Sequence, residues 1–126
     1  MRKIWIVDDD EEMTQAVQLM LQLIDCETTG YYNARSATQS LLAGNRPDLM
    51  ILDINMPEVS GLDLLEFLRR RAEWKNLPVV MLSTEAADVT VDKAMKLGAD
   101  GYITKPVTIE ELERAINSAL QKHTKG

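Results

Sequence analysis

The sequence predicts a doubly wound α/β fold, in which a five-stranded parallel sheet of order 2-1-3-4-5 carries helices on both faces. Two observations support this prediction. Segments of strand length alternate with amphipathic helical segments along the chain, and three of the strand segments, at 4–7, 49–52 and 79–82, are continuously apolar. Continuous apolar runs are typical of parallel strands covered on both faces. Right-handed crossovers leave few topologies for five such units, and 2-1-3-4-5 is the commonest of them.

The first half of the chain predicts three strands and two helices. The run IWIV at 4–7 is wholly apolar, and apolar residues then recur at helical spacing over 13–24. The acids at 10–12 precede that helix, where negative charge meets the positive end of the helix dipole. Ser36 can cap a second helix. The expected elements are a strand at 4–7, a helix at 13–24, a strand at 27–33, a helix at 36–43 and a strand at 49–52, closed by Asp53.

The second half repeats the alternation. Three leucines lie on one side of the segment 62–72, which follows the loop from Met56 to Gly61. Gly98 ends the next helical segment, and Thr108 can cap the last one. The expected elements are a helix at 62–72, a strand at 79–82, a helix at 88–97, a strand at 101–104 and a helix at 109–121.

Length and composition indicate a single globular domain over residues 1–126. Hydrophobic residues make up 45% and charged residues 27%, and no apolar run is long enough to cross a bilayer. Cys26 is the sole cysteine, which excludes an internal disulfide or a cysteine metal cluster. The net charge of −6 argues against direct nucleic-acid binding by this domain. The start of the chain does not resemble a signal peptide, so we expect a cytoplasmic protein.

Polar side chains follow four of the five expected strands at their carboxyl ends. In this fold, ligands bind at that edge of the sheet, beyond strands 1 and 3, where the winding reverses. A single aspartate at a strand end is more often a helix cap, but the conjunction of four is specific. The residues are Asp8 and Asp9 after strand 1, Asp53 and Asn55 after strand 3, Ser83 with Thr84 and Glu85 after strand 4, and Lys105 after strand 5.

These residue types point to phosphoryl chemistry. Three neighbouring carboxylates cannot all stay charged unless a cation joins them, and ligands that are all oxygen favour Mg²⁺. A carboxylate beside such a cation can act as a nucleophile. Lys105 can neutralise a phosphoryl oxygen, and the Ser83 hydroxyl can hydrogen-bond another. We therefore predict a site that accepts a phosphoryl group on Asp53.

The sequence also resembles a known family from about residue 3 to residue 120. It is similar to the receiver domain of two-component response regulators, of which the bacterial chemotaxis regulator is one and whose fold is flavodoxin-like. The stretches that carry the resemblance are IVDDD at 6–10, PDLMILDINMPEVSGLDLLEFLR at 47–69, LPVVMLSTEA at 77–86 and LGADGYITKP at 97–106.

The resemblance implies a role for each site residue. Asp53 would be the phosphoacceptor and Asp9 would bind Mg²⁺ directly, with Asp8 assisting through water. Asn55 would offer its backbone carbonyl to the metal. Ser83 and Lys105 would hold the phosphoryl group, and the Lys105–Pro106 peptide bond would be cis.

The resemblance also implies a conformational switch and a short lifetime for the phosphorylated state. Ser83 would move toward the phosphoryl oxygens and Tyr102 would turn inward behind it, which changes the surface of the fourth helix, fifth strand and fifth helix. Tyr102 could instead be an ordinary amphipathic surface tyrosine. Asn55 and Glu85 occupy positions that tune dephosphorylation in the family and match the chemotaxis regulator, which implies a short-lived phosphorylated state. Gly101, where dimerising relatives often have Asp, weakens the case for a dimer through that surface.

The phosphoryl donor must come from outside the chain. His123 lies in an expected tail and no ATP-binding motif is present, so the domain catalyses only its own phosphorylation and dephosphorylation. The implied partners are a sensor histidine kinase or a histidine phosphotransfer protein, together with an unknown output protein or domain. We expect a monomer or a phosphorylation-dependent dimer, and no membrane association.

Two other functions compete with this reading. A Mg²⁺-dependent phosphatase of the haloacid-dehalogenase type also uses an aspartyl nucleophile, but it carries D-x-D-x-T after strand 1, whereas here the acceptor follows strand 3 and reads Asp53-Ile54-Asn55. A flavin- or nucleotide-binding protein would need a phosphate-cradling loop after strand 1. The acids at 8–12 would repel a phosphate there.

Three features outside the site carry further expectations: two tryptophans and a run of arginines. Trp74 lies in a polar segment and is expected to be exposed, and the run at 69–71 (RRR) is expected to be a solvated helix end. Trp5 lies on the central strand close to Asp8. We expect its fluorescence to respond to Mg²⁺.

Overall fold

The computed structural model describes residues 1–124 and shows five strands alternating with five helices. This alternation confirms the βα repeat that the sequence predicts. The elements are β1 (Arg2–Val7), α1 (Glu11–Leu23), β2 (Cys26–Tyr31), α2 (Ala34–Leu42), β3 (Leu49–Asp53), α3 (Gly61–Arg70), β4 (Val79–Ser83), α4 (Asp88–Lys96), β5 (Gly101–Thr104) and α5 (Ile109–Thr124).

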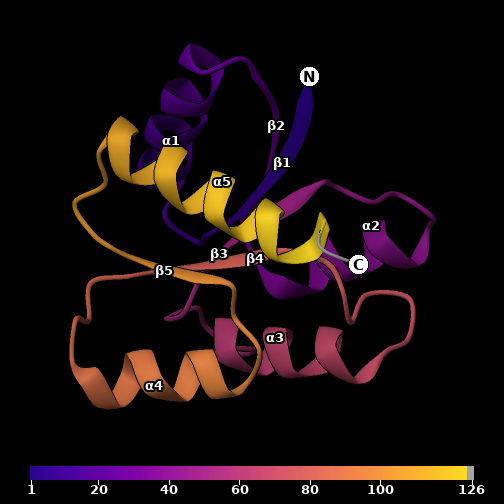
Figure 1. Ribbon diagram of the computed structural model, residues 1–126. Helices are drawn as coiled ribbons and strands as arrows, with labels where there is room; N and C mark the ends of the chain where they lie inside the picture. The colour runs from indigo at the N-terminus through magenta and orange to yellow at the C-terminus, as the bar shows by residue number, and fades with distance from the viewer. Residues whose placement is uncertain (125–126) are drawn as a thin grey trace.

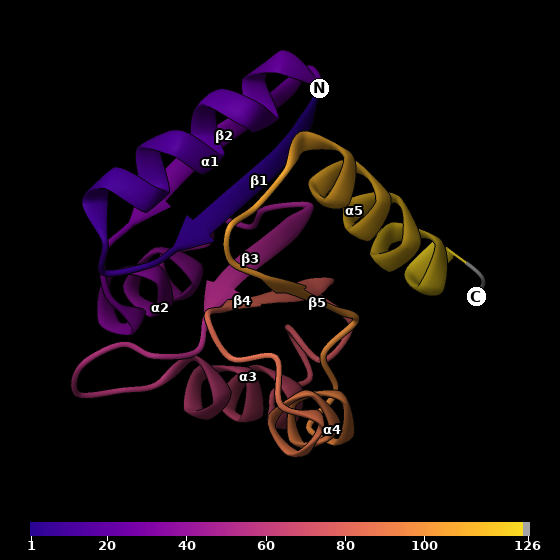
Figure 2. The same ribbon diagram turned by 90° about the vertical axis from the view of Figure 1, so that its left-hand side faces the viewer.

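The strands form one parallel sheet in the order β2-β1-β3-β4-β5, as predicted. Helices α1 and α5 cover one face, and α2, α3 and α4 cover the other (Figures 1 and 2). The order places β1 and β3 side by side in the middle of the sheet, where the winding changes direction. A ligand site is therefore expected beyond their carboxyl ends.

Two apolar cores lie on the two faces of the sheet. Along β1, Ile4 and Ile6 pack toward α1 and α5, while Trp5 and Val7 pack toward the helices of the other face. All five residues of β3 and of β4 are buried, including the polar residue that ends each strand. This double burial explains the continuous apolar runs in the sequence.

The ends of the first two helices show how local signals operate here. Asp10 caps α1, since its side chain accepts a hydrogen bond from the backbone N–H of Met13, and Glu11 and Glu12 fill the first turn as expected. The cap of α2 is Asn33, whose side chain accepts from the N–H of Ser36 at 2.7 Å. The predicted Ser36 cap is therefore wrong, because Asn33 begins the helix earlier and β2 ends at Tyr31.

Three expectations about the end of the sheet opposite the acidic residues are wrong. Trp74 is buried (5% exposed), because it packs beside Phe67 with the Arg71 guanidinium over its ring at 5.2 Å. The Arg69 side chain is only 14% exposed, so this part of the arginine run is interior. His123 belongs to α5, and its Nε2 lies 2.9 Å from Asp100 Oδ1.

No helix within residues 1–124 combines the length and the apolar character that a membrane span requires.

Candidate functional site

The carboxyl edge of the sheet positions the site residues through strand register. Val7 pairs with Leu52 and Asp53 pairs with Leu82, so Asp8 and Asp53 leave adjacent strands at nearly the same level. On the other side, the backbone N–H of Lys105 donates to the Ser83 carbonyl at 2.8 Å. The pairing of strands thus brings together residues that lie far apart in the chain.

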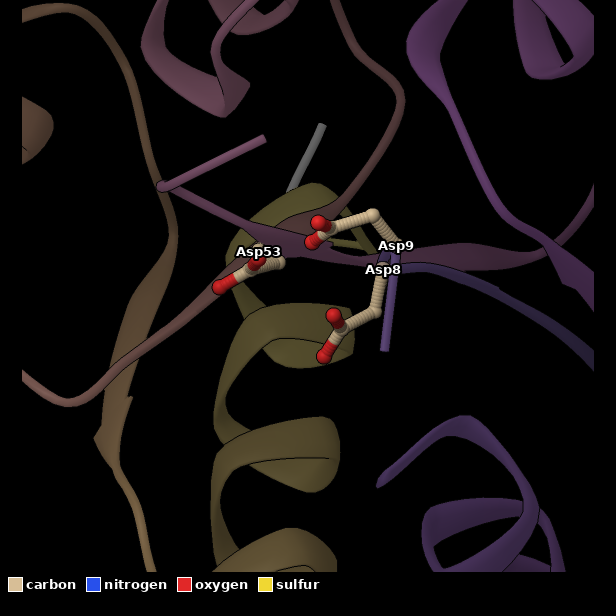
Figure 3. Close-up of side chains that lie close together, drawn as sticks. All are labelled: Asp8, Asp9 and Asp53. Atoms are coloured by element: carbon tan, nitrogen blue, oxygen red, sulfur yellow. The ribbon is translucent and has the colours of Figure 1, made fainter. Parts of the chain in front are cut away.

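Asp8, Asp9 and Asp53 form an acidic cluster. One carboxylate oxygen from each lies within 4.8 Å of the others, and the three side chains converge from two strand ends (Figure 3). Asp8 and Asp53 are buried at 0% and 3% exposed, while Asp9 is exposed. A set made only of oxygen donors, with one ligand open to solvent, fits a hard cation such as Mg²⁺ that keeps part of its water shell.

Lys105 joins the buried members of this cluster. Its Nζ lies 3.2 Å from Asp8 Oδ2 and 3.4 Å from Asp53 Oδ1. Burial lowers the pKa of Lys105, but the charges of Asp53 and Asp8 outweigh that effect and raise it. The lysine therefore stays a cation at the edge where two carboxylates are buried.

Asp53 is the acid of the cluster whose pKa is raised. Burial and the charge of Asp8 together raise its pKa to about 6, although Lys105 opposes both effects. One lysine does not offset two buried carboxylates, so ionised Asp53 is short of positive charge. A divalent cation at the cluster would supply it.

Gly61 is a residue of the site that the sequence analysis treated only as the end of a loop. Its N–H donates to the Ile54 carbonyl at 2.8 Å, which closes the loop that follows Asp53. A Cβ at position 61 would overlap the Asp53 carbonyl oxygen, so only glycine allows this approach. Glu58 in the same loop has φ 68°. The glycine fixes where Asp53 sits relative to the loop.

The remaining predicted residues lie around the rim. Ser83 is buried, and its Oγ accepts a hydrogen bond from the Glu85 N–H at 3.0 Å. Tyr102 is half-buried, and its hydroxyl donates to the Glu85 carbonyl at 2.7 Å. The side chains of Asn55 and Glu85 are exposed. The Lys105–Pro106 peptide bond is cis.

Thr14 was missed altogether. It is fully buried in the first turn of α1, and its hydroxyl lies 2.9 Å from the Asp10 carbonyl and 3.3 Å from that of Asp8. Its spacing along the helix is that of an apolar residue, and nothing in the sequence distinguishes it from an exposed helical threonine. The tertiary structure was needed to find it.

Comparison with known proteins decides the family. The sequence model of the protein family described as the response regulator receiver domain matches residues 4–117 of this chain. The chain belongs to this family. Chemotaxis protein CheY of Pseudomonas aeruginosa is 30% identical over 120 residues, which cover 95% of this chain and 97% of that protein. The receiver fold and the acidic edge described above are thus those of a two-component signalling domain.

Longer relatives contain a receiver domain as one part. Transcriptional regulatory protein CpxR of Klebsiella pneumoniae is 35% identical over 97% of this chain, which spans 50% of its length. Protein RcaC of Microchaete diplosiphon is 32% identical, and the chain spans 18% of it. The chain therefore covers half or less of these two relatives.

Solved structures agree with the receiver fold. Chemotaxis protein CheY4 of Vibrio cholerae superposes with a TM-score of 0.85 at 28% identity, covering 94% of this chain and 98% of that one. A response regulator receiver domain protein from Clostridium thermocellum gives 0.87 at 27% identity, with 98% of both chains covered.

Trp5 offers an optical probe of this receiver site. Its ring packs on Tyr31 at 4.8 Å, and the Tyr31 carbonyl accepts the Asp8 N–H at 3.0 Å. In a Trp74→Phe variant, which leaves Trp5 alone, we expect Mg²⁺ to change the emission with a saturable dependence, because the cation repositions Asp8. The Trp5→Phe variant should show little response. A flat titration of Trp74→Phe would contradict the expectation.

Proposed function

We propose that this receiver domain accepts a phosphoryl group on Asp53 from a phosphohistidine, with Mg²⁺ bound at the acidic cluster. The donor is a sensor histidine kinase or a histidine phosphotransfer protein. The observation that carries the proposal is the buried Asp53 carboxylate, which shares Lys105 with Asp8 at the ligand-binding edge of the sheet. Bound Mg²⁺ supplies positive charge that neutralises the carboxylates and the phosphoryl oxygens.

Each residue then has a defined task in the transfer. Asp8 and Asp9 would hold the cation together with Asp53 and the backbone carbonyl of Asn55. An Asp53 carboxylate oxygen attacks phosphorus, a new O–P bond forms, and the N–P bond to the donor imidazole breaks. The imidazole leaves with the electron pair of that bond and takes a proton. Lys105 balances the charge that builds on the phosphoryl oxygens.

The reverse of the signal is hydrolysis of the acyl phosphate. Water attacks phosphorus, the bond to the Asp53 oxygen breaks, and inorganic phosphate leaves. The side chains of Asn55 and Glu85 are exposed at the rim, where they can orient or admit that water. This placement supports the proposal of a short-lived phosphorylated state.

We assign the switch to Ser83 and Tyr102. Phosphorylation adds about −1.5 to −2 charges at Asp53, and the Ser83 hydroxyl can donate to one of the new oxygens. Tyr102 lies at the rim, held by the Glu85 carbonyl. Its inward rotation would break that bond and reshape the surface of α4, β5 and α5.

The output partner is left open by this proposal. One relative is named a chemotaxis protein and another a transcriptional regulatory protein, so the names of the relatives do not point to a single output. We propose a cytoplasmic domain, monomeric or dimerising on phosphorylation, that itself binds neither nucleic acid nor membrane. The phosphatase alternative is not favoured, because Asp53 ends β3 rather than β1 and the second position after it is Asn55.

Acetyl phosphate tests the proposal directly. Incubation with acetyl phosphate and Mg²⁺ should add the mass of one phosphoryl group to the wild type, and nothing to Asp53→Asn. Asp63→Asn, which removes an exposed acid of α3, is the matched control and should still be labelled. The label should be lost within minutes. A wild type without the adduct would refute phosphoacceptance, and steady turnover of p-nitrophenyl phosphate would instead indicate a phosphatase.

A further inference from the structure

Thr14 is a buried polar residue, and the other buried polar residues that the structure describes belong to the candidate site. Among the described residues, the polar or charged side chains classed as buried are those of Asp8, Thr14, Asp53 and Ser83. Three of these belong to the site. Burying a polar group costs free energy unless the group is hydrogen-bonded. The hydrogen bonds of Thr14 therefore require an explanation.

The Thr14 hydroxyl spans the peptide segment that carries Asp9. Its single hydrogen is shared between the Asp10 carbonyl at 2.9 Å and the Asp8 carbonyl at 3.3 Å. These two carbonyls flank Asp9 on both sides. The backbone N–H of Thr14 also donates to the Asp10 carbonyl at 3.0 Å, so the residue ties the end of β1 to the first turn of α1.

We propose that Thr14 is a positioning residue, which fixes the backbone on both sides of Asp9 so that its carboxylate faces the acidic cluster. This proposal rests on the proposed function. Asp9 is the exposed member of the cluster, so the path of its own backbone directs its side chain. Asp8, by contrast, is held through its side chain by the N–H of Asp10 at 3.0 Å and by Lys105.

The neighbouring strand leaves room for this arrangement. A Cβ added at Gly30 of β2 would lie 2.8 Å from the Thr14 Cγ2 atom, closer than carbon atoms approach without displacement. Glycine at position 30 therefore accommodates the threonine methyl group while the hydroxyl points to the carbonyls. This contact comes from β2 and is independent of the hydrogen bonds within the turn.

Thr38 provides a matched control within the same chain. Its hydroxyl donates to the Ala34 carbonyl at 2.8 Å, which is the same bond from position i to i−4 that Thr14 makes to Asp10. Such bonds are common for threonine in helices. Thr38 lies on α2, away from the acidic cluster, so Thr38→Val measures the loss of this bond alone.

The test compares Mg²⁺ affinity by NMR titration of backbone amides. Thr14→Val should weaken Mg²⁺ binding by about 10-fold, the lower end of outer-shell effects, while Thr38→Val leaves it unchanged. Thr14→Ser keeps the hydroxyl and should restore affinity. In the metal-free protein, amide hydrogen exchange at Asp10 should be faster in Thr14→Val than in the wild type.

Two outcomes would overturn the proposal: equal affinities for Thr14→Val and wild type, or equal losses in Thr14→Val and Thr38→Val. If Thr14→Val does not fold, Gly30→Ala crowds the same side chain and should lower affinity in the same direction, and an unchanged affinity there also counts against it. Failure of the proposed function is separate. It would show as a wild type that binds Mg²⁺ but takes no phosphoryl group from acetyl phosphate.

Discussion

Replacing Asp53 with asparagine should make the metal-free protein more stable, by about 2–3 kcal/mol above pH 7. Burial and the Asp8 charge raise the pKa of Asp53 from 3.8 to about 6. An acid whose pKa is higher in the folded state binds its proton more tightly there, so ionised Asp53 destabilises the fold. An amide of the same shape removes that charge and can keep a hydrogen bond at the site.

The pH dependence of this gain follows from the same pKa. Well below pH 3.8 the carboxyl is protonated in both states, so the substitution gains nothing there. The penalty grows as pH rises from 3.8 to about 6 and is constant above. Urea unfolding in EDTA, at a series of pH values between 4 and 8, measures the difference between Asp53→Asn and wild type.

Two comparisons make this result specific. Asp92→Asn removes an exposed acid of α4 and should change stability by less than about 0.5 kcal/mol. Saturating Mg²⁺ should reduce the difference in the free energy of unfolding between Asp53→Asn and wild type, because the cation stabilises the wild type more. A gain that is the same at pH 4 and pH 8 would contradict the electrostatic explanation.

Arg69→Met should destabilise the protein by about 3–5 kcal/mol, the usual result of removing one partner of a buried ion pair. The guanidinium donates to Asp100 Oδ2 at 3.1 Å, to the Gly98 carbonyl at 2.9 Å and to the Leu77 carbonyl at 2.8 Å. Burial lowers the pKa of Arg69, and Asp100 opposes that effect. Methionine fills the space but leaves these acceptors without their donor.

The next residue of α3 supplies the control. Arg70 pairs with Glu66 at 3.6 Å, and its side chain is 76% exposed. Exposed pairs contribute little, so Arg70→Met should cost less than about 1 kcal/mol. Both variants are measured by urea unfolding at neutral pH. Equal effects in the two variants would show that the Arg69 contacts have no special weight.

The sheet could be predicted from the sequence because a parallel strand buried on both faces needs a continuous apolar run. Such runs, as at residues 49–52, are hard to mistake when helical segments separate them. The predicted ends of helices and strands were less accurate, because neighbouring residues can each cap the same helix. Asn33 and Ser36 are both capping residues, and only the path of the chain after β2 decides between them.

The acidic cluster could be predicted because strand ends meet at one edge of a parallel sheet. Thr14 and Gly61 could not, because their roles depend on distances between elements. The predictions that Trp74 and Arg69 are exposed were wrong for a related reason. Both residues lie among polar residues in the sequence, and their burial comes from how α3 packs on the turns beside β4 and β5.

The ion pair between Asp8 and Lys105 joins residues 97 positions apart. Contacts of such sequence separation close large loops, and that entropy cost delays their formation during folding. The pair also needs β1, β3 and β5 in place together. A chain that has folded only its first half therefore holds the three acids of the cluster without Lys105. Under the proposed function, a kinase could therefore phosphorylate the domain only after all of it has been synthesised and folded.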